Sequence, residues 1–192
     1  MADVRQQLFR FRSYTPIPFL LAMIVFAQPT VWSFVIGAAV AAAGEGMRLW
    51  GVAYAGPLTR VTGSVGAPSL ITSGPFAFVR NPLYLGNIVL YAGVGVMTNA
   101  FVPWLALGTF AYFALQYAAI VSLEEEFLQR EFGSRYDEYR KSVPRFIPRL
   151  IPWQAGKAIG QRPDWKGAVR SERRTFQAIS LVGLTVLIRW WI

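Results

Sequence analysis

Residues 74–86 read GPFAFVRNPLYLG and lie directly before an apolar segment that is long enough for a membrane helix. A Gly-Pro turn opens the stretch, and Pro82 fits the first turn of a helix, where its missing N–H costs nothing. Free N–H groups at this helix start, next to Arg80, would form a site for a carboxylate. An ordinary helix start at a membrane surface, with Arg80 facing lipid phosphate, would have the same sequence.

The composition around this stretch is that of a membrane protein. The chain has 192 residues, and 54% of them are hydrophobic, which exceeds the roughly 45–50% of globular proteins. Continuous apolar runs favour a single integral membrane domain over residues 1–192. The net charge of +9 comes from basic residues beside apolar segments, so we expect membrane lipids as partners and no nucleic acid.

Two residue types are missing from the chain. It contains no Cys and no His, which excludes disulfides, thiol nucleophiles, histidine bases and the usual transition-metal sites. We therefore expect no metal, and most catalytic templates are excluded.

Five apolar segments predict an all-α bundle of transmembrane helices, each near the roughly 20 residues that a bilayer requires. They run over residues 14–28, 31–55, 82–98, 101–123 and 175–192. With the N-terminus in the cytoplasm, the short outer turns carry no Lys or Arg, as the positive-inside rule requires. Five crossings then place the C-terminus outside and the polar segments at the cytoplasmic face.

Two longer polar segments follow from this topology. Residues 56–80 are rich in Gly, Ser, Thr and Pro, which is typical of a loop. In residues 124–142, aromatic and leucine side chains recur at helical spacing, which predicts an amphipathic helical extension of the fourth span, bent at Gly133. Prolines in residues 143–148 then force an extended connection.

Carboxylates occur at two membrane borders. Glu124, Glu125 and Glu126 follow the fourth span, and carboxylates at a low-dielectric boundary require a cationic partner. Arginines of residues 140–149 or a cationic ligand could supply it. Glu45 and Arg48 stand at i, i+3 within the second span, where they can pair with each other or contact a substrate.

Two further features of the sequence could indicate either ligand binding or ordinary helix packing. Gly93 and Gly95 allow close approach of a ligand or of a neighbouring helix. Tyr136 and Tyr139 offer faces on which an adenine ring could stack, although an amphipathic helix on a membrane has the same pattern. Arg145 lies between Pro144 and Phe146, so its side chain can turn toward the bundle to orient a substrate or bind a lipid headgroup.

Together these residues resemble the isoprenylcysteine carboxyl methyltransferase family and its phospholipid N-methyltransferase relatives. The resemblance covers about residues 44–150 and rests on residues 74–86, on the Glu-Glu pair with its following Phe-Gly-x-x-Tyr, and on residues 143–148. Two positions differ, because Asn81 replaces the usual His of the family pattern and Phe76 replaces a common Tyr.

The resemblance implies a membrane enzyme that binds S-adenosylmethionine at the cytoplasmic face and methylates a carboxylate or an amine of a lipophilic acceptor. It implies that the segment after residue 123 helps to form the cofactor site, while residues 151–192 add an interfacial segment and the last span. Glu124 and Arg145 are the predicted catalytic residues, and Arg48 and Glu45 are the predicted substrate residues. The predicted cofactor-binding residues are Arg80, Asn81, Pro82, Tyr84, Leu85, Gly86, Gly93, Gly95, Glu124, Glu125, Tyr136, Tyr139 and Pro144.

Two alternatives remain at this point. One is a non-catalytic membrane scaffold or lipid-binding protein. The other is an NADPH-dependent membrane reductase, because Arg48-Leu49-Trp50 and Asn81-Pro82-x-Tyr84 are similar to segments of sterol reductases. The Glu-Glu pair and the residues after it fit a methyltransferase better than a reductase.

Overall fold

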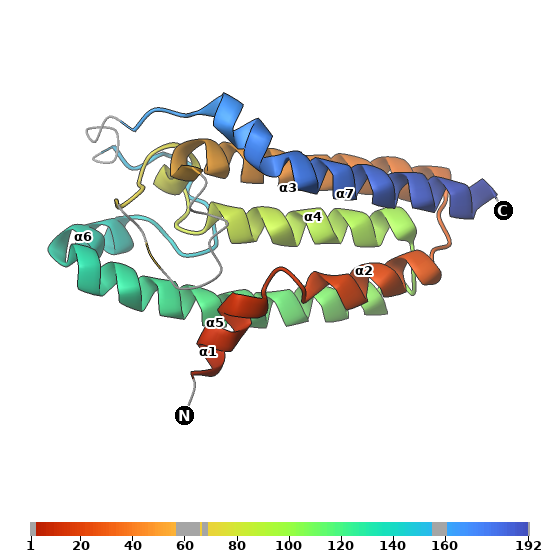
Figure 1. The fold of residues 1–192 in the computed structure, drawn as a ribbon, viewed down its shortest axis with the longest axis horizontal. Helices are drawn as coiled ribbons and strands as arrows, with labels where there is room; N and C mark the ends of the chain where they lie inside the picture. Colours follow the sequence, from red (N-terminus) through yellow and green to blue (C-terminus); the bar gives the residue numbers. More distant parts are fainter. Residues whose placement is uncertain (1–2, 57–65, 67–68, 155–160, 192) are drawn as a thin grey trace.

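The computed structural model describes residues 3–56, 66, 69–154 and 161–191, and most of these residues are helical. Five helices run along the long axis of the molecule (Figure 1). They are α2 (Pro16–Val25), α3 (Val31–Ala55), α4 (Pro82–Thr98), α5 (Trp104–Phe132) and α7 (Trp165–Trp191). Within the described residues, three short helices accompany them, namely α1 (Val4–Phe11), the 3-10 helix η2 (Gly74–Ala77) and α6 (Ser134–Ser142). Within these described ranges no strand occurs, so the all-α prediction is confirmed.

Local sequence signals set the helix ends. Thr30 and Ser33 form a capping box at the start of α3, in which each side chain accepts a hydrogen bond from the other's backbone N–H. Pro82 occupies the first turn of α4, as its sequence predicts. Gly133, with φ of 53°, separates α5 from α6 and produces the predicted bend.

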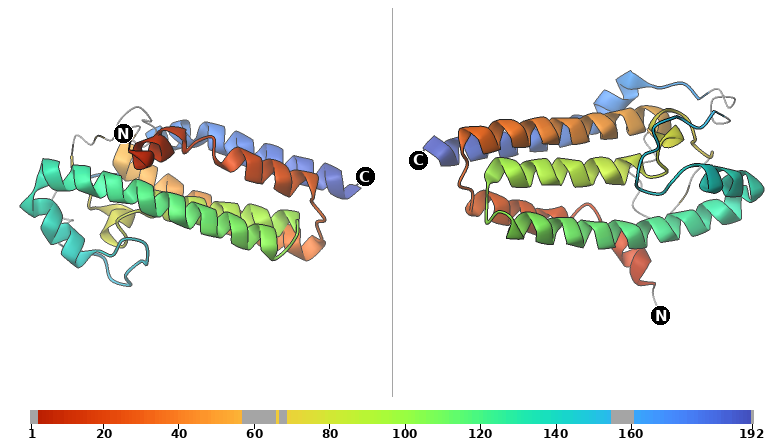
Figure 2. Two further views of the ribbon diagram at one scale, coloured as in Figure 1. Left: turned by 90° about the horizontal axis from the view of Figure 1, so that it is seen from below. Right: turned by 180° about the vertical axis from the view of Figure 1, so that it is seen from behind.

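The closest packing in the bundle is between the antiparallel helices α3 and α4, which lie side by side in the right-hand view of Figure 2. Glycines lie at the contact from both sides. A Cβ atom at Gly44 would collide with the backbone of Leu90, and one at Gly93 would collide with the backbone of Ala41. Glycine is therefore required here because the two backbones nearly touch.

The remaining helices pack around this pair. α7 lies along α3, and α5 lies on the other side of α4 (Figure 1). α2 contacts both α4 and α7, while α1 bends away from α2 by 52° and packs on α5. One core cluster joins α2, α3, α4 and α7 through Met23, Ala41, Leu90, Val94, Met97 and Val186.

The chain after α6 returns to the start of α4 as an extended segment, as the prolines predict. We call residues 143–153 the return segment. Its backbone bonds to the stretch before α4, because Arg80 N donates to Pro144 O at 2.9 Å and Trp153 N donates to Ala77 O at 2.9 Å. Tyr139 of α6 adds a hydrogen bond from its hydroxyl to Phe76 O at 2.7 Å. These bonds bring the polar parts of the sequence together.

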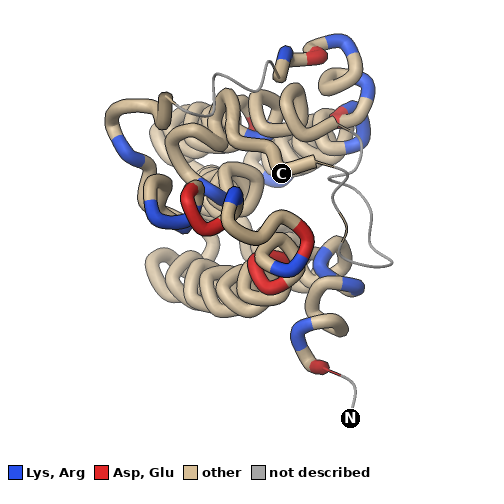
Figure 3. The backbone as a smooth tube through the Cα atoms, turned by 90° about the vertical axis from the view of Figure 1, so that its left-hand side faces the viewer, with Lys and Arg blue, Asp and Glu red and all other residues tan. Residues whose placement is uncertain are grey.

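Charged residues concentrate at one end of the long axis, which carries α6, the start of α4 and the start of α7 (Figure 3). We call it the charged end. The opposite end holds the turns between α2 and α3 and between α4 and α5, and neither turn contains Lys or Arg. Large apolar side chains are exposed on the outer faces of the bundle, including Trp32 at 75%, Trp104 at 76% and Leu115 at 75%.

Helices α3 and α4 coincide with the predicted segments 31–55 and 82–98, and α5 covers most of 101–123 and continues to Phe132, as the predicted helical extension requires. The first predicted span, 14–28, is only the ten-residue helix α2, and α7 begins at Trp165, ten residues before the predicted start at 175. By length and composition, α5 is long and apolar enough to cross a membrane, and the bent pair α1–α2 passes the same test as one unit. Of the predicted loop at 56–80, residues 57–65 and 67–68 lie outside the described residues, and Gly74–Ala77 form the 3-10 helix η2.

Candidate active site

A cavity of about 800 Å³ opens at the charged end and extends between the helices. Its polar wall comes from the α1–α2 turn, the start of α4, the end of α5 and α6, and contains Arg12, Ser13, Arg80, Asn81, Tyr84, Glu124, Glu125, Tyr136 and Tyr139. Its apolar wall comes from α2, α4 and α7 and contains Leu20, Leu90, Val94, Ala178, Ile179 and Val182. The volume is within the range of small-molecule and cofactor sites.

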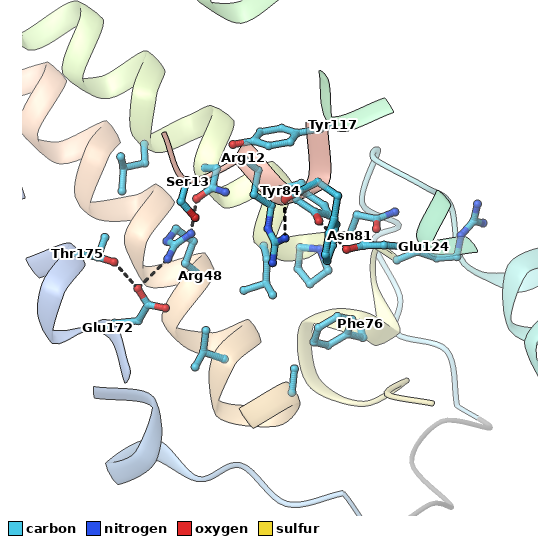
Figure 4. Close-up of a pocket in the computed structure, with 18 of the residues that line it drawn as sticks. Arg12, Ser13, Arg48, Phe76, Asn81, Tyr84, Tyr117, Glu124, Glu172 and Thr175 are labelled. Atoms are coloured by element: carbon cyan, nitrogen blue, oxygen red, sulfur yellow. Dashed lines mark hydrogen bonds and ion pairs between the residues drawn. The ribbon is translucent and has the colours of Figure 1, made fainter. Parts of the chain in front are cut away.

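The end of α5 presents its first two glutamates differently. Glu125 is bound by two arginines: Arg80 donates to its Oε1 through Nε at 3.0 Å and Nη2 at 2.8 Å, and Arg145 donates to its Oε2. Glu124 accepts a hydrogen bond from the Tyr84 hydroxyl at 2.7 Å and lines the cavity (Figure 4). Consecutive helix residues point about 100° apart, which separates the two carboxylates.

Arg80, Glu125 and Arg145 form what we call the border cluster. Arg80 also donates through Nη1 to Val143 O at 2.6 Å and to Arg140 O at 3.0 Å. The cluster therefore fastens the return segment to α4 and α5. Arg145 is a partner of the kind that the sequence predicts from residues 140–149, whereas Arg80 comes from the stretch before α4.

A second group of charges lies deeper, between α3, α4 and α7, and we call it the bundle cluster. Arg48 donates to Glu45 at 2.9 Å and to Glu172 at 2.7 Å, and it also donates to Asn87. The Thr175 hydroxyl donates to Glu172 at 2.6 Å (Figure 4). Glu172 is 1% exposed although it lies in a sequence run of arginines. The cluster couples α7 to the other two helices at the cavity wall.

Two tyrosines of α6 form the inner part of the polar wall. Burial raises the pKa of Tyr136 and of Tyr139, so both hydroxyls remain protonated at neutral pH. The Tyr139 hydroxyl donates to Phe76 O. The Tyr136 hydroxyl is buried and has no hydrogen-bond partner within the described part of the chain. A buried hydroxyl on a cavity wall is suited to bind a polar group of a ligand.

The structure brings part of the predicted site together. The predicted residues that line the cavity are Arg48, Arg80, Asn81, Pro82, Tyr84, Glu124, Glu125, Tyr136 and Tyr139. The predicted residues outside this lining are Glu45, Leu85, Gly86, Gly93, Gly95, Pro144 and Arg145. Gly86 and Gly93 face α3, where a side chain would collide with that helix. Asn81 donates through Nδ2 to Arg145 O at 3.1 Å, which also ties the return segment to α4.

Several lining residues have no counterpart in the sequence-based prediction. Asn87 and Tyr91 lie one and two turns beyond Tyr84 on α4, so helical spacing could have found them. Arg12 and Glu172 come from segments far from the motifs, and only the packing of α1 and α7 brings them to the cavity. No group of three or more acidic side chains that could hold a metal occurs among the residues with described positions.

Comparison with known proteins identifies the family. The phospholipid methyltransferase family model matches residues 32–135, which is more than half of the chain. The chain belongs to this family. Phospholipid methyltransferase relatives include integral membrane methyltransferases, which confirms the family resemblance predicted from the sequence. The matched residues include α3, α4 and the glutamates of α5, while Arg12 and Glu172 lie outside them.

Individual relatives cover the chain to different extents. The cobalt-zinc-cadmium resistance protein CzcN of Cupriavidus metallidurans is 27% identical over 178 residues, which cover 82% of this chain and 78% of that protein. Protein-S-isoprenylcysteine O-methyltransferase of Schizosaccharomyces pombe is 36% identical over 43% of this chain and 34% of that protein. Methanethiol S-methyltransferase 2 of Bradyrhizobium diazoefficiens is 35% identical over 55% and 37%, respectively. No solved structure matches the chain.

Proposed function

We propose that this protein is an S-adenosylmethionine-dependent methyltransferase that acts on a lipophilic acceptor at the charged end of the bundle. The observation that carries this proposal is the single cavity whose polar wall contains Glu124, Tyr84 and Tyr136 and whose apolar wall is built by α2, α4 and α7. A charged cofactor and an apolar acceptor can both enter such a cavity and meet within it.

The residues present fit the cofactor. S-adenosylmethionine is cationic at its sulfonium and ammonium groups, and the Glu124 carboxylate offers the opposite charge. The Tyr136 hydroxyl lacks a partner in the described structure and can bond to a polar group of the nucleoside. The border cluster holds the return segment in place, so Glu125 supports the site by fixing its wall.

The acceptor fits the other half of the cavity. Side chains of α2, α4 and α7 give it an apolar lining, and the buried layer of Met23, Met97 and Val186 closes the bundle beyond that lining. Arg48 and Glu172 border this lining and can orient a polar head. The relatives' names specify both O-methylation and S-methylation, so the acceptor atom differs among the relatives.

The bound cofactor would supply a methyl group already activated by its sulfonium, so the protein needs mainly to position the reactants and exclude water. Glu124 would hold the cationic end, and the Tyr84 hydroxyl fixes one oxygen of that carboxylate by its hydrogen bond. A carboxylate acceptor needs no base, and an amine acceptor would lose one proton to water or to a glutamate.

We further propose that α3, α4, α5, α7 and the bent pair α1–α2 cross the membrane, with the N-terminus inside and the C-terminus outside. The exposed apolar side chains around the bundle and the concentration of charge at one end support this topology. A reporter fused after residue 192 should be accessible only from outside the membrane. A reporter found in the cytoplasm would mean that one of the proposed membrane crossings is absent.

Calorimetry on the purified protein in detergent tests the proposed cofactor. S-adenosylmethionine and its demethylated product should bind, and Glu124→Gln should weaken that binding by about 1–3 kcal/mol, the range for a charge-assisted hydrogen bond. Glu131→Gln is the matched control, because Glu131 is an exposed glutamate of α5 that does not line the cavity. It should leave the affinity unchanged.

Three outcomes separate the proposal from the alternatives. Binding of NADPH in place of S-adenosylmethionine would identify a reductase. Binding of neither ligand by the folded protein would favour the scaffold alternative. Equal affinities of the Glu124→Gln variant and the unmodified protein for S-adenosylmethionine would mean that the cofactor binds but does not contact Glu124.

A further inference from the structure

Arg12 brings a cationic side chain to the cavity from outside the family-matched region. It lies between α1 and α2 and lines the cavity near Tyr84 and Glu124 (Figure 4). Its Nη1 donates to Phe9 O at 2.9 Å, and its guanidinium carbon lies 3.9 Å from the centre of the Phe9 ring. Phe9 is buried, so these contacts hold the guanidinium against the bundle.

The segment that carries Arg12 is fixed at both ends. Arg5 of α1 pairs with Glu126 of α5. On the other side of Arg12, the Thr15 hydroxyl donates to Gln116 Oε1 of α5 at 3.1 Å. These contacts fix the position of the Arg12 side chain on the cavity wall. That position does not depend on the free N-terminus.

The charges around this place are complementary. Arg12 is close enough to act electrostatically on both the Glu124 carboxylate and the Tyr84 hydroxyl. The cavity thus has a guanidinium and a carboxylate on adjoining parts of its wall.

We propose that Arg12 and Glu124 together bind the zwitterionic amino-acid end of the cofactor, with Arg12 on its carboxylate and Glu124 on its ammonium group. This inference rests on the proposed function. An α-amino acid carries both charges on one carbon, so its receptor needs opposite charges side by side, which the cavity wall supplies. Guanidinium also matches the two oxygens of a carboxylate. The N-terminal segment thereby becomes part of the cofactor site.

The experiment compares S-adenosylmethionine with decarboxylated S-adenosylmethionine, which keeps the amino group and lacks only the carboxylate. Calorimetry on the full-length protein in detergent gives both affinities. The unmodified protein should bind the complete cofactor about ten- to hundredfold more tightly, the range for a lost charged hydrogen bond. Arg12→Ala should remove this preference and leave the affinity for the decarboxylated compound unchanged. Arg12→Lys should restore part of the preference.

Arg10→Ala is the matched control, because Arg10 is an exposed residue of α1 that does not line the cavity. It should keep the full preference, which separates the role of Arg12 from a general loss of positive charge. A preference that survives in Arg12→Ala, or that is absent in the unmodified protein, would overturn the inference while leaving the proposed function intact. Failure of S-adenosylmethionine to bind at all would reject both.

Discussion

The bundle cluster and the border cluster use the same two residue types in opposite proportions. In the bundle cluster one arginine, Arg48, forms ion pairs with two glutamates. In the border cluster one glutamate, Glu125, forms ion pairs with two arginines. The first joins three helices, and the second joins helices to the return segment, where Arg80 also bonds to backbone carbonyls. The ion pairs of the bundle cluster thus hold a helix in the bundle, whereas those of the border cluster hold the wall of the site in place.

This difference predicts that the two clusters tolerate substitution unequally. Arg48 is the shared partner of its cluster, so its loss affects two buried carboxylates at once. When either arginine of the border cluster is removed, the other one still pairs with Glu125. The predictions below test this order, from the largest expected effect to the smallest.

Arg48→Met should lower the free energy of unfolding by about 3–5 kcal/mol, because it leaves Glu45 and Glu172 buried without their shared guanidinium. Methionine keeps most of the side-chain volume, which limits the effect to charge and hydrogen bonding. Denaturant titration in mixed micelles measures the change. Arg170→Met, at an exposed position of α7, is the control and should have little effect. A loss below about 1 kcal/mol for Arg48→Met would mean that water reaches the two carboxylates.

Arg80→Met should cost less, about 2–3 kcal/mol, because Arg145 still pairs with Glu125 while the carbonyls of Arg140 and Val143 lose a donor. Limited proteolysis should show faster cleavage in the return segment. Arg140→Met is the control at a surface ion pair with Asp137 and should change stability by about 0–0.5 kcal/mol. Equal losses for Arg80→Met and Arg48→Met would refute the unequal tolerance.

Arg145→Ala should have the smallest effect on folding, about 0.5–1 kcal/mol, because the Arg145 side chain is 42% exposed and solvent screens its pair with Glu125. Cofactor affinity should remain nearly unchanged, while turnover of a lipid acceptor should fall if Arg145 orients that acceptor. A methyl-transfer assay beside calorimetry separates the two. Unchanged turnover would make Arg145 a membrane anchor and would direct the search for acceptor contacts to Arg48 and Glu45.

Much of this architecture is readable from sequence because local rules determine it. The start of α4 at Pro82, the bend at Gly133 and the extended course after α6 each follow from the conformational limits of proline or glycine. Glu45 and Arg48 pair because they lie one turn apart on one helix. The helix-forming segments are likewise visible as apolar runs.

The rest depends on packing that the sequence does not encode locally. Glu124 and Glu125 are identical neighbours in sequence, and only the positions of Tyr84 and the two arginines decide which one bonds to the tyrosine and which one to the arginines. Glu172 stands among arginines and suggests a solvated helix start, yet α7 buries it against α3. Arg12 reaches the site only because α1 folds back on α5.

The glycine contacts between α3 and α4 have a consequence for motion. Gly37, Gly44 and Gly93 leave no room for one helix to slide past the other, since any shift would drive backbone into backbone. These two helices should therefore move as one rigid body, with the slowest amide hydrogen exchange in the chain. Whatever opening admits an acceptor must then come from displacement of α2 or α7, which form the apolar wall of the cavity together with α4.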